Sequence, residues 1–494
     1  MTAHGGGTKH CVKGRQYDPA IDPFAPPCVP GTPGSFSGNN GGATAAGVTK
    51  DEVRVTVYVP NHGAAIDTVL RAQGLYYDAS NVRDMAPAFT KFINDKFQLY
   101  GRKVTITAFQ GTCSVVPPQT SCLLPEMDKM VAETKPYAVV FVSTVCSACF
   151  TELARKGVVT TGSTGFSDAL LNANAPYMYS LGMSSTKMQQ AFARFWCGQM
   201  TSKGGAGRTA IFGGAQNPAQ DFRKQPRQLG VMSTNDPDAL NTVRTVLYPS
   251  LDKGCGDSVD GHEYFYSQDV ANATQQSQAG IARMNTTQNP ATSVLCLCDP
   301  VAPLFIYNAA ANNNYWPETL IASNQLMDTD NAGQSYGGGA GCPQGARGCT
   351  FDNALGLGDA GQAVPSASLA VTKVYQAGGG GALPIAATAA QQIWESLNQI
   401  MSLVENTGPQ LTAGSMQAAA PGMGLVTGPG GARRGFASED WSWSKDVRLT
   451  YWSKNQKSPV NDKAGHYFSF GGRRFLPDEI PGAAQPAAPL ADQR

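Results

Sequence analysis

The sequence has few charged residues, and it lacks both a long apolar run and a basic patch. Charged residues make up 15% of the 494 residues, against about 25% in an average soluble protein. The net charge is +1, and Lys and Arg are nowhere concentrated among aromatic residues. Nucleic-acid binding is therefore not expected, because contact with phosphates needs clustered basic side chains. No run reaches the ~18 apolar residues that predict a transmembrane helix.

Histidine is also scarce, and the common catalytic motifs are missing. A structural zinc site needs four ligands, whereas none of the five histidines belongs to a group with ligand spacing: His4, His10, His62, His262 and His466. The stretch "GGGGALP" lacks the strand, helix and Lys of a phosphate-binding loop. No G-x-S-x-G motif lies between a strand and a helix. We therefore expect no catalytic residue, no metal site and no cofactor, and a protein that is not an enzyme.

The first residues, "MTAHGGGTKHC", lack the apolar segment of a signal peptide. We interpret the chain as a processed one with an added initiator Met, whose original leader was of the secretory or the lipoprotein type. The abundance of Gly (55) and Pro (32) is typical of a loop-rich exported protein. We expect an extracytoplasmic location, either secreted or lipid-anchored to the cell envelope.

The chain contains 12 cysteines, which favours an oxidising compartment. Two short Gly- and Pro-rich loops, "GTCSVVPPQTSCL" and "GCPQGARGCT", resemble surface loops closed by a disulfide. The alternative is that their cysteines are reduced and buried as small apolar side chains. The expected disulfide pairs are Cys11–Cys28, Cys113–Cys122, Cys197–Cys255 and Cys342–Cys349.

Cys146-Ser-Ala-Cys149 follows a predicted buried strand and begins a predicted helix. A helix N-terminus lowers a thiol pKa, so this position suits a redox centre. The surrounding elements lack the compact context of a redox fold, which favours a structural role, with ligand contact, redox chemistry and metal binding as alternatives. Cys296 and Cys298 lie on one face of a predicted strand, where they either pack in the core or bond to other cysteines.

The length exceeds that of one compact core and predicts at least two lobes. Residues 1–47 show neither the helical nor the strand spacing of apolar residues, and this predicts an extended N-terminal arm. From "DEVRVTVYVP" onward, strands and helices alternate in two runs, which indicates parallel sheets covered by helices on both faces. The second run begins after Ser184-Ser185, and its first strand is predicted at "RTAIFGG" (208–214). The predicted units are an arm (1–47), a first lobe (48–184 with part of 328–430), a second lobe (185–327 with part of 431–478) and a disordered tail (479–494).

Several stretches carry a family resemblance through their order and spacing. They are "GVTKDEVRVTVYVP", "VVFVSTVCSACFTELARKGVVTTGST", "IARMNTTQNPATSVLCLCDP", "TLIASNQLMD" and "VRLTYWS…FGGRRFLP". In these the chain resembles the periplasmic-binding-protein type I family, and more narrowly the branched-chain-amino-acid-type substrate-binding proteins of ABC transporters, in an actinobacterial style. The resemblance implies an α/β fold of two lobes, a hinge of three crossings and a ligand cleft between the lobes.

The ligand site is expected just beyond the strands, because open parallel sheets bind ligands at the carboxyl ends of their strands. The residues at those positions are Asn61, His62, Ser143, Thr144, Cys146, Ser147, Thr161, Ser163, Phe166, Gln216, Asn217, Asp299, Asn324 and Gln325. His62 is alternatively a solvated loop residue, and Asp299 alternatively precedes a helix. The aromatic cluster Trp441, Trp443, Tyr451 and Trp452 favours strand packing over a sugar platform.

In the amino-acid-binding relatives, an acidic residue of the second lobe holds the ligand's ammonium group. The corresponding position here reads Ser323-Asn324-Gln325, and only Asp299 could take that role. We therefore expect a solute that is either amino-acid-like or neutral and bulkier. The resemblance implies a monomeric solute-binding protein that delivers this solute to the permease of an ABC importer. The alternatives are a ligand-sensing receptor module and a thiol oxidoreductase that uses Cys146 and Cys149.

Overall fold

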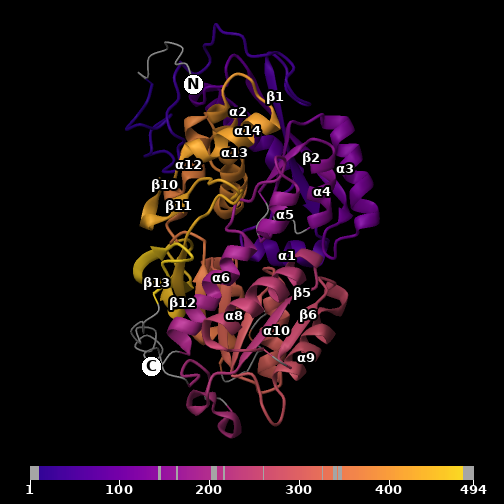
Figure 1. Cartoon of the computed structure of the whole chain (residues 1–494), viewed down its shortest axis with the longest axis vertical. Coiled ribbons are helices and arrows are strands. Elements are labelled where there is room, and N and C mark those ends of the chain that lie inside the picture. Colours follow the sequence, from indigo (N-terminus) through magenta and orange to yellow (C-terminus); the bar gives the residue numbers. More distant parts are fainter. Residues whose placement is uncertain are drawn as a thin grey trace.

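The protein consists of two α/β lobes arranged end to end (Figure 1). The computed structural model describes residues 10–142, 146–162, 165–201, 209–214, 217–259, 261–324, 326–337, 342 and 348–481. Within these residues, no helix is long and apolar enough to cross a membrane. Each lobe has a sheet of mainly parallel strands flanked by helices, which confirms the predicted fold class.

The first lobe is built on a four-stranded parallel sheet with the order β2-β1-β3-β4. The strands are β1 (Glu52–Asn61), β2 (Lys103–Ser114), β3 (Ala138–Phe141) and β4 (Val159–Thr161). In β1, Val53, Val55 and Val57 are fully buried, which accounts for the alternation seen in the sequence. β3 is buried on both faces, as expected of a central parallel strand that helices cover.

Eight helices belong to the first lobe: α1 (Ala64–Ala72), α2 (Ala79–Lys96), α3 (Thr120–Thr134), α4 (Ser147–Arg155), α5 (Asp168–Ala173), α12 (Ala370–Ala377), α13 (Ala387–Thr407) and α14 (Ala413–Ala419). α13 is the longest of these helices, with 21 residues. Its Trp394 is fully buried and lies 5.4 Å from Phe92 and 5.7 Å from Phe89 of α2, measured between ring centroids. A chain segment far along the sequence thus completes the first core.

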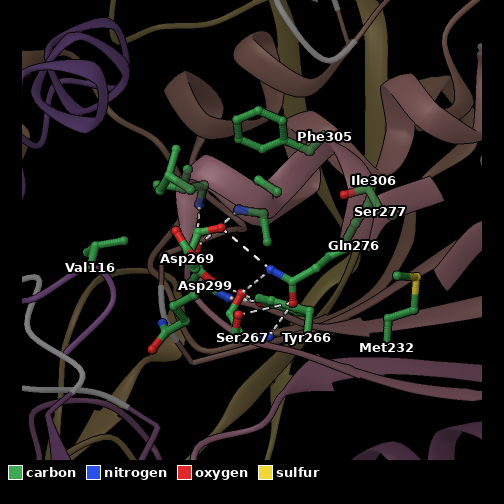
Figure 2. A pocket seen from close by; sticks show the side chains of 15 residues that line it. Val116, Met232, Tyr266, Ser267, Asp269, Gln276, Ser277, Asp299, Phe305 and Ile306 are labelled. Atoms are coloured by element: carbon green, nitrogen blue, oxygen red, sulfur yellow. Dashed lines mark hydrogen bonds between the residues drawn. The ribbon is translucent and has the colours of Figure 1, made fainter. Parts of the chain in front are cut away.

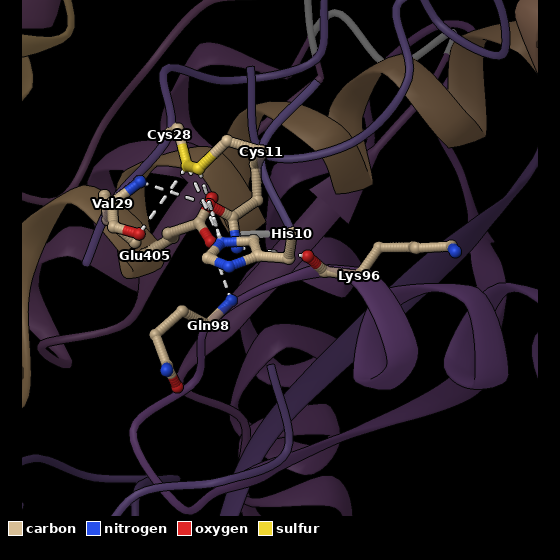
Figure 3. The surroundings of a disulfide bond; sticks show 8 residues. His10, Cys11, Cys28, Val29, Lys96, Gln98 and Glu405 are labelled. Carbon is tan, nitrogen blue, oxygen red and sulfur yellow. Dashed lines mark hydrogen bonds between the residues drawn. A yellow bond between two sulfur atoms is a disulfide. The ribbon is translucent and has the colours of Figure 1, made fainter. Parts of the chain in front are cut away.

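The described part of the N-terminal arm, residues 10–47, has no regular helix or strand. It nevertheless packs on the first lobe. Tyr17 lies 5.1 Å from the ring of Phe92, and Asp22 Oδ2 accepts a hydrogen bond of 2.7 Å from Trp394 Nε1. The Cys11–Cys28 disulfide closes the arm beside the ring of His10 (Figure 3). The arm is therefore a fixed layer of the first lobe.

The second lobe contains a seven-stranded sheet with the order β13-β12-β9-β8-β7-β5-β6. Its strands are β5 (Leu229–Thr234), β6 (Glu263–Tyr266), β7 (Ser293–Leu297), β8 (Glu318–Ser323), β9 (Leu355–Gly358), β12 (Val447–Lys457) and β13 (Ala464–Phe475). The five strands from β6 to β9 are parallel, and β12 and β13 add an antiparallel edge. A separate two-stranded ribbon pairs β10 (Val426–Thr427) with β11 (Arg433–Arg434).

The helices of the second lobe are α6 (Ser185–Phe195), α7 (Pro237–Thr242), α8 (Tyr248–Cys255), α9 (Ala273–Met284), α10 (Ala302–Asn312) and α11 (Asp330–Gly337). Two π-helical turns, η1 (Trp196–Met200) and η4 (Val243–Leu247), extend α6 and join α7 to α8. The chain crosses between the lobes three times. Residues 181–183, 358–370 and 443–447 lead from one apolar core to the other.

The strand predicted at 208–214 is wrong. Residues 209–214 form no strand, and Thr209 makes only an isolated bridge to Pro226. The first strand of the second lobe is β5, in the segment "LGVMST". Gly230 weakened the strand pattern of that segment, yet the fold requires it, because a Cβ there would lie 2.6 Å from Met284 Sδ.

The described residues contain six disulfides. They are Cys11–Cys28, Cys113–Cys122, Cys146–Cys149, Cys197–Cys255, Cys296–Cys298 and Cys342–Cys349. The cysteines whose connectivity stayed open in the sequence thus bond to their nearest neighbours. The tryptophans of the aromatic cluster are packed in the interior, with Trp443 and Trp452 each 1% exposed. Only Tyr451 and Trp452 lie in a strand, β12, whereas Trp441 and Trp443 precede it and pack in the core of the first lobe.

A buried ion pair leads to a stability prediction. Arg227 and Glu318 have fully buried side chains, and Glu318 also accepts hydrogen bonds from Phe212 N and Ser293 Oγ. Replacing Arg227 with Met leaves the Glu318 carboxylate buried without its cation, so we expect a loss of about 3–5 kcal/mol in the free energy of unfolding. Urea denaturation of the second lobe measures this loss.

The exposed pair of Arg223 and Asp221 is the matched control. Arg223→Met should cost less than about 1 kcal/mol, because exposed pairs contribute little. The double variant Arg227→Met/Glu318→Leu should recover much of the lost stability. Equal effects of Arg223→Met and Arg227→Met would contradict the prediction.

Candidate ligand-binding cleft

A cavity of about 420 Å³, partly open to solvent, lies at the carboxyl ends of the second-lobe strands and reaches the first lobe. We call it the cleft cavity. It is lined by Gly165 of the first lobe and by Ser185, Met188, Gln189, Ser233, Thr234, Ala239, Leu297, Cys298, Ala322, Ser323 and Asn324 of the second. These residues come from the start of α6 and α7 and from the ends of β5, β7 and β8. The cavity therefore occupies the edge where parallel sheets bind ligands.

Three polar side-chain atoms in its wall are buried without a hydrogen-bond partner among the described residues. One is Ser323 Oγ at the end of β8, and the other two lie on α6: Ser185 Oγ and Gln189 Oε1, on residues that are 8% and 3% exposed. Ser184 positions both, because its hydroxyl caps α6 by accepting a hydrogen bond from Lys187 N. Since buried polar groups are nearly always paired, these two atoms are available to a ligand that enters the cavity.

No charged side chain lines the cleft cavity among the described residues. Carboxylates at its rim are instead used to join the lobes. Asp236 Oδ2 accepts a hydrogen bond of 3.1 Å from Ser147 Oγ of the first lobe. Asp238 accepts hydrogen bonds from the amide and the hydroxyl of Ser167, and burial raises the pKa of its carboxyl group. The lobes are thus in direct contact at the rim.

Beneath the cavity, the three crossings meet in a hydrogen-bonded junction. Met183 N donates to Asp359 Oδ2 at 2.8 Å, and Asn324 Nδ2 donates to Met183 O at 2.9 Å. Arg474 donates to the carboxylate of Asp446 and to the carbonyl of Asp359, each at 2.9 Å. Burial and, next, the Asp328 carboxylate raise the pKa of Asp359 to about 7.

The structure places one of the predicted site residues, Asn324, in the wall of the cleft cavity. Phe166 follows the lining residue Gly165, and its ring lies 4.7 Å from that of Phe150, measured between centroids. Ser147 lies at the rim through its contact with Asp236.

Four other predicted residues have structural partners and do not line the cleft cavity. Asn61 Nδ2 donates to Thr112 O at 2.7 Å, and His62 Nδ1 lies 3.7 Å from Asp67 Oδ1 at the start of α1. Thr161 bonds to Gln399 of α13. Cys146 is 2% exposed and forms its disulfide with Cys149 at the N-terminus of α4.

Asn217 and Asp299 are placed differently from the prediction. Asn217 Nδ2 donates to Asn314 O, which precedes β8, so Asn217 lies at the amino-terminal edge of the sheet. Asp299 is no free carboxylate in the cleft cavity, because its oxygens accept hydrogen bonds from Val301 N, Ala302 N and Tyr266 OH. The predicted residues that lie outside the described part of the chain are Ser143, Thr144, Ser163, Gln216 and Gln325.

Sequence reasoning missed most of the second-lobe wall. Ser233 and Thr234 were overlooked because β5 was not recognised. Ser185 and Gln189 lie on α6, whereas the predicted site residues were chosen only from positions that follow strands. The segment "MSSTKMQQ" did contain a sign of this wall. A Ser that caps the helix is followed there by polar residues on the side of the helix that faces the core, where apolar residues are usual.

No family model matches the chain, and no curated protein matches it. Solved structures do. A possible leucine/isoleucine/valine-binding protein from Rhodopirellula baltica is 14% identical, with a TM-score of 0.55 over 85% of this chain and 97% of that one. A solute-binding protein of an ABC transporter from R. palustris, in complex with 4-hydroxybenzoate, is 13% identical, with a TM-score of 0.54 over 85% and 97%.

A closed leucine-, isoleucine-, valine-, threonine- and alanine-binding protein from Brucella ovis is 12% identical, with a TM-score of 0.53 over 88% of this chain and 98% of that one. Identities this low concern the fold alone. The fold of this chain is that of the two-lobed type I periplasmic binding proteins, which confirms the resemblance seen in the sequence.

The junction generates a prediction about pH. Because the pKa of Asp359 is raised in the folded protein, its contribution to stability is complete below pH 4 and is lost as the pH rises towards about 7. Asp359→Asn removes this dependence while its amide oxygen can still accept from Met183 N. Relative to the parent, the variant should gain on the order of 1–3 kcal/mol between pH 4 and pH 8.

Calorimetric unfolding of both proteins across this pH range measures the difference. Asp462→Asn is a suitable control, since Asp462 is exposed and pairs only with Lys457 at the surface. A difference between Asp359→Asn and the parent that stays constant with pH would contradict the assignment.

Proposed function

We propose that the protein is an extracytoplasmic solute-binding protein. It captures a small organic solute in the cleft cavity and delivers it to the permease of an ABC importer, and it is not an enzyme. The fold and the position of the cavity between the lobes support this proposal. The structures with this fold include proteins solved with benzoates and proteins described as binding branched-chain amino acids.

The observation that carries the proposal is the pair of unpartnered buried atoms, Ser185 Oγ and Gln189 Oε1. An amide oxygen can only accept, so the solute must offer an N–H or O–H group to Gln189. Met188 and Leu297 provide apolar contact nearby. The solute therefore combines a hydrogen-bond donor with an apolar body, which suits an amino-acid-like or a neutral, bulkier molecule.

Binding and closure are coupled in this proposal. The solute contacts both lobes only when the rim contacts between Ser147 and Asp236 and between Ser167 and Asp238 are formed. It therefore stabilises the closed state over the open one and shifts the population towards closure. The permease would then recognise the closed form.

The cysteines support a structural role over a redox one. Cys146 and Cys149 are 2% and 1% exposed and bonded to each other. Thiol–disulfide exchange requires an attacking thiolate to reach one of the sulfur atoms. A disulfide as buried as this one is better suited to a structural role in the first lobe than to a catalytic role.

The proposal is tested first by a thermal-shift screen with branched and aromatic amino acids, amides, aromatic acids, sterols and sugars. A solute that binds only the folded state raises the melting temperature, because it stabilises that state. At 100 times its Kd, the added free energy of unfolding is about 2.7 kcal/mol. For the solute found, Gln189→Ala should weaken binding by roughly tenfold in calorimetry, because one hydrogen bond of about 1.4 kcal/mol is lost.

Gln190→Ala is the matched control, since Gln190 is the next residue of α6 and is exposed. It should leave the affinity within roughly twofold of the parent. Equal losses in the two variants would place the solute elsewhere. A flat response to the whole panel by protein freed of bound solute through unfolding and refolding would count against the proposed function.

A further inference from the structure

A second cavity lies on the other face of the second-lobe sheet. We call it the flank cavity (Figure 2). Its volume is about 410 Å³, part of it open to solvent, and its walls include Val116, Met232, Tyr266, Gln276, Asp299 and Phe305. Met232 and Ser233 are consecutive in β5, so their side chains point to opposite faces. Met232 lines the flank cavity and Ser233 lines the cleft cavity, with the sheet between them.

The polar groups of the flank cavity are bonded to one another (Figure 2). Tyr266 OH donates to Asp299 Oδ2 at 2.9 Å, and Val301 N donates to Asp299 Oδ1 at 2.8 Å. Gln276 Oε1 accepts from Ser267 N at 2.6 Å, and its Nε2 donates to Ser267 O at 3.2 Å. None of the unpartnered buried side-chain atoms found in the described residues belongs to this wall.

The remaining wall is apolar and joins the two lobes. Val116, in the loop after β2, belongs to the first lobe, whereas Val301, Phe305 and Ile306 belong to the second. Next to the cavity, Leu70 of α1 packs in one cluster with Val301 and Phe305. A molecule in this cavity touches both lobes, so its binding favours their closure.

We propose that the flank cavity is a second binding site, which takes an uncharged apolar molecule of about the size of one substituted ring. An apolar molecule needs no hydrogen bond from a wall whose polar groups are already satisfied. An anion is disfavoured, because carboxylates of Asp269 and Asp299 line the cavity and no basic side chain does.

The two cavities therefore select by different chemistry. The cleft cavity offers unpartnered acceptors from α6, whereas no unpartnered buried side-chain atom of the described residues lines the flank cavity. This second site is independent of the proposed function, because it rests on other residues and needs no permease or transported solute.

The experiment uses the full chain and two fluorinated probes of similar size, 4-fluorotoluene and 4-fluorobenzoate. Ala273 at the start of α9 lines the flank cavity, and Ala239 of α7 lines the cleft cavity. Ala273→Trp should fill the first and Ala239→Trp the second. Fluorine NMR titration should show that Ala273→Trp weakens 4-fluorotoluene binding by at least roughly tenfold, while Ala239→Trp changes it less than about twofold.

Any binding of 4-fluorobenzoate should be unaffected by Ala273→Trp. A crystal soaked in 4-bromotoluene should show the anomalous peak of bromine beside Phe305, which locates the site even if one Trp variant folds poorly. The proposal is overturned if the parent fails to bind 4-fluorotoluene at its solubility limit. It is equally overturned if Ala239→Trp alone abolishes binding, or if bromine lies only beside Gly165.

Discussion

The hydrogen-bonded junction of the three crossings is the contact on which the rest of the structure depends. Met183, Asp359 and Asp446 each belong to a different crossing, and Arg474 joins two of them through its guanidinium group. Because the crossings are held side by side, both sheets turn the carboxyl ends of their strands towards the same space. The site between the lobes is thus a consequence of how the crossings are fixed.

The second-lobe sheet then divides this space into two environments. Side chains alternate along β5, so Met232 and Ser233 contribute to cavities on opposite faces. On one face, the start of α6 leaves Ser185 and Gln189 without partners. On the other face, Asp299 accepts a hydrogen bond from Tyr266 OH and two more from the amides of Val301 and Ala302, where α10 begins. One sheet therefore supports a polar cavity and an apolar one without any change in backbone architecture.

Most of the fold could be predicted from the sequence, because a buried face of a strand or helix carries apolar residues at a regular spacing along the chain. The alternation of Val53, Val55 and Val57 and the long apolar face of α13 are direct examples. The site was harder, since it depends on which groups remain unpaired after packing. Asp299 looked available because the sequence does not show that Tyr266, two strands away in the sheet, occupies its carboxylate. Gln189 was not among the predicted residues, because nothing in the local sequence reveals a cavity beside α6.

The disulfides cross-link each lobe without tying one lobe to the other. Each of the six bonds joins cysteines of the same lobe or of the arm packed on it, so none of them spans the cleft. They restrict the unfolded chain and stiffen each lobe, while the relative position of the lobes stays under the control of noncovalent contacts. At the rim these are carboxylate contacts such as Ser147 with Asp236, and at the flank they are apolar contacts such as Leu70 with Val301. Under the proposed function, contacts of these two kinds are the ones that a bound solute adds to when it shifts the population towards the closed state.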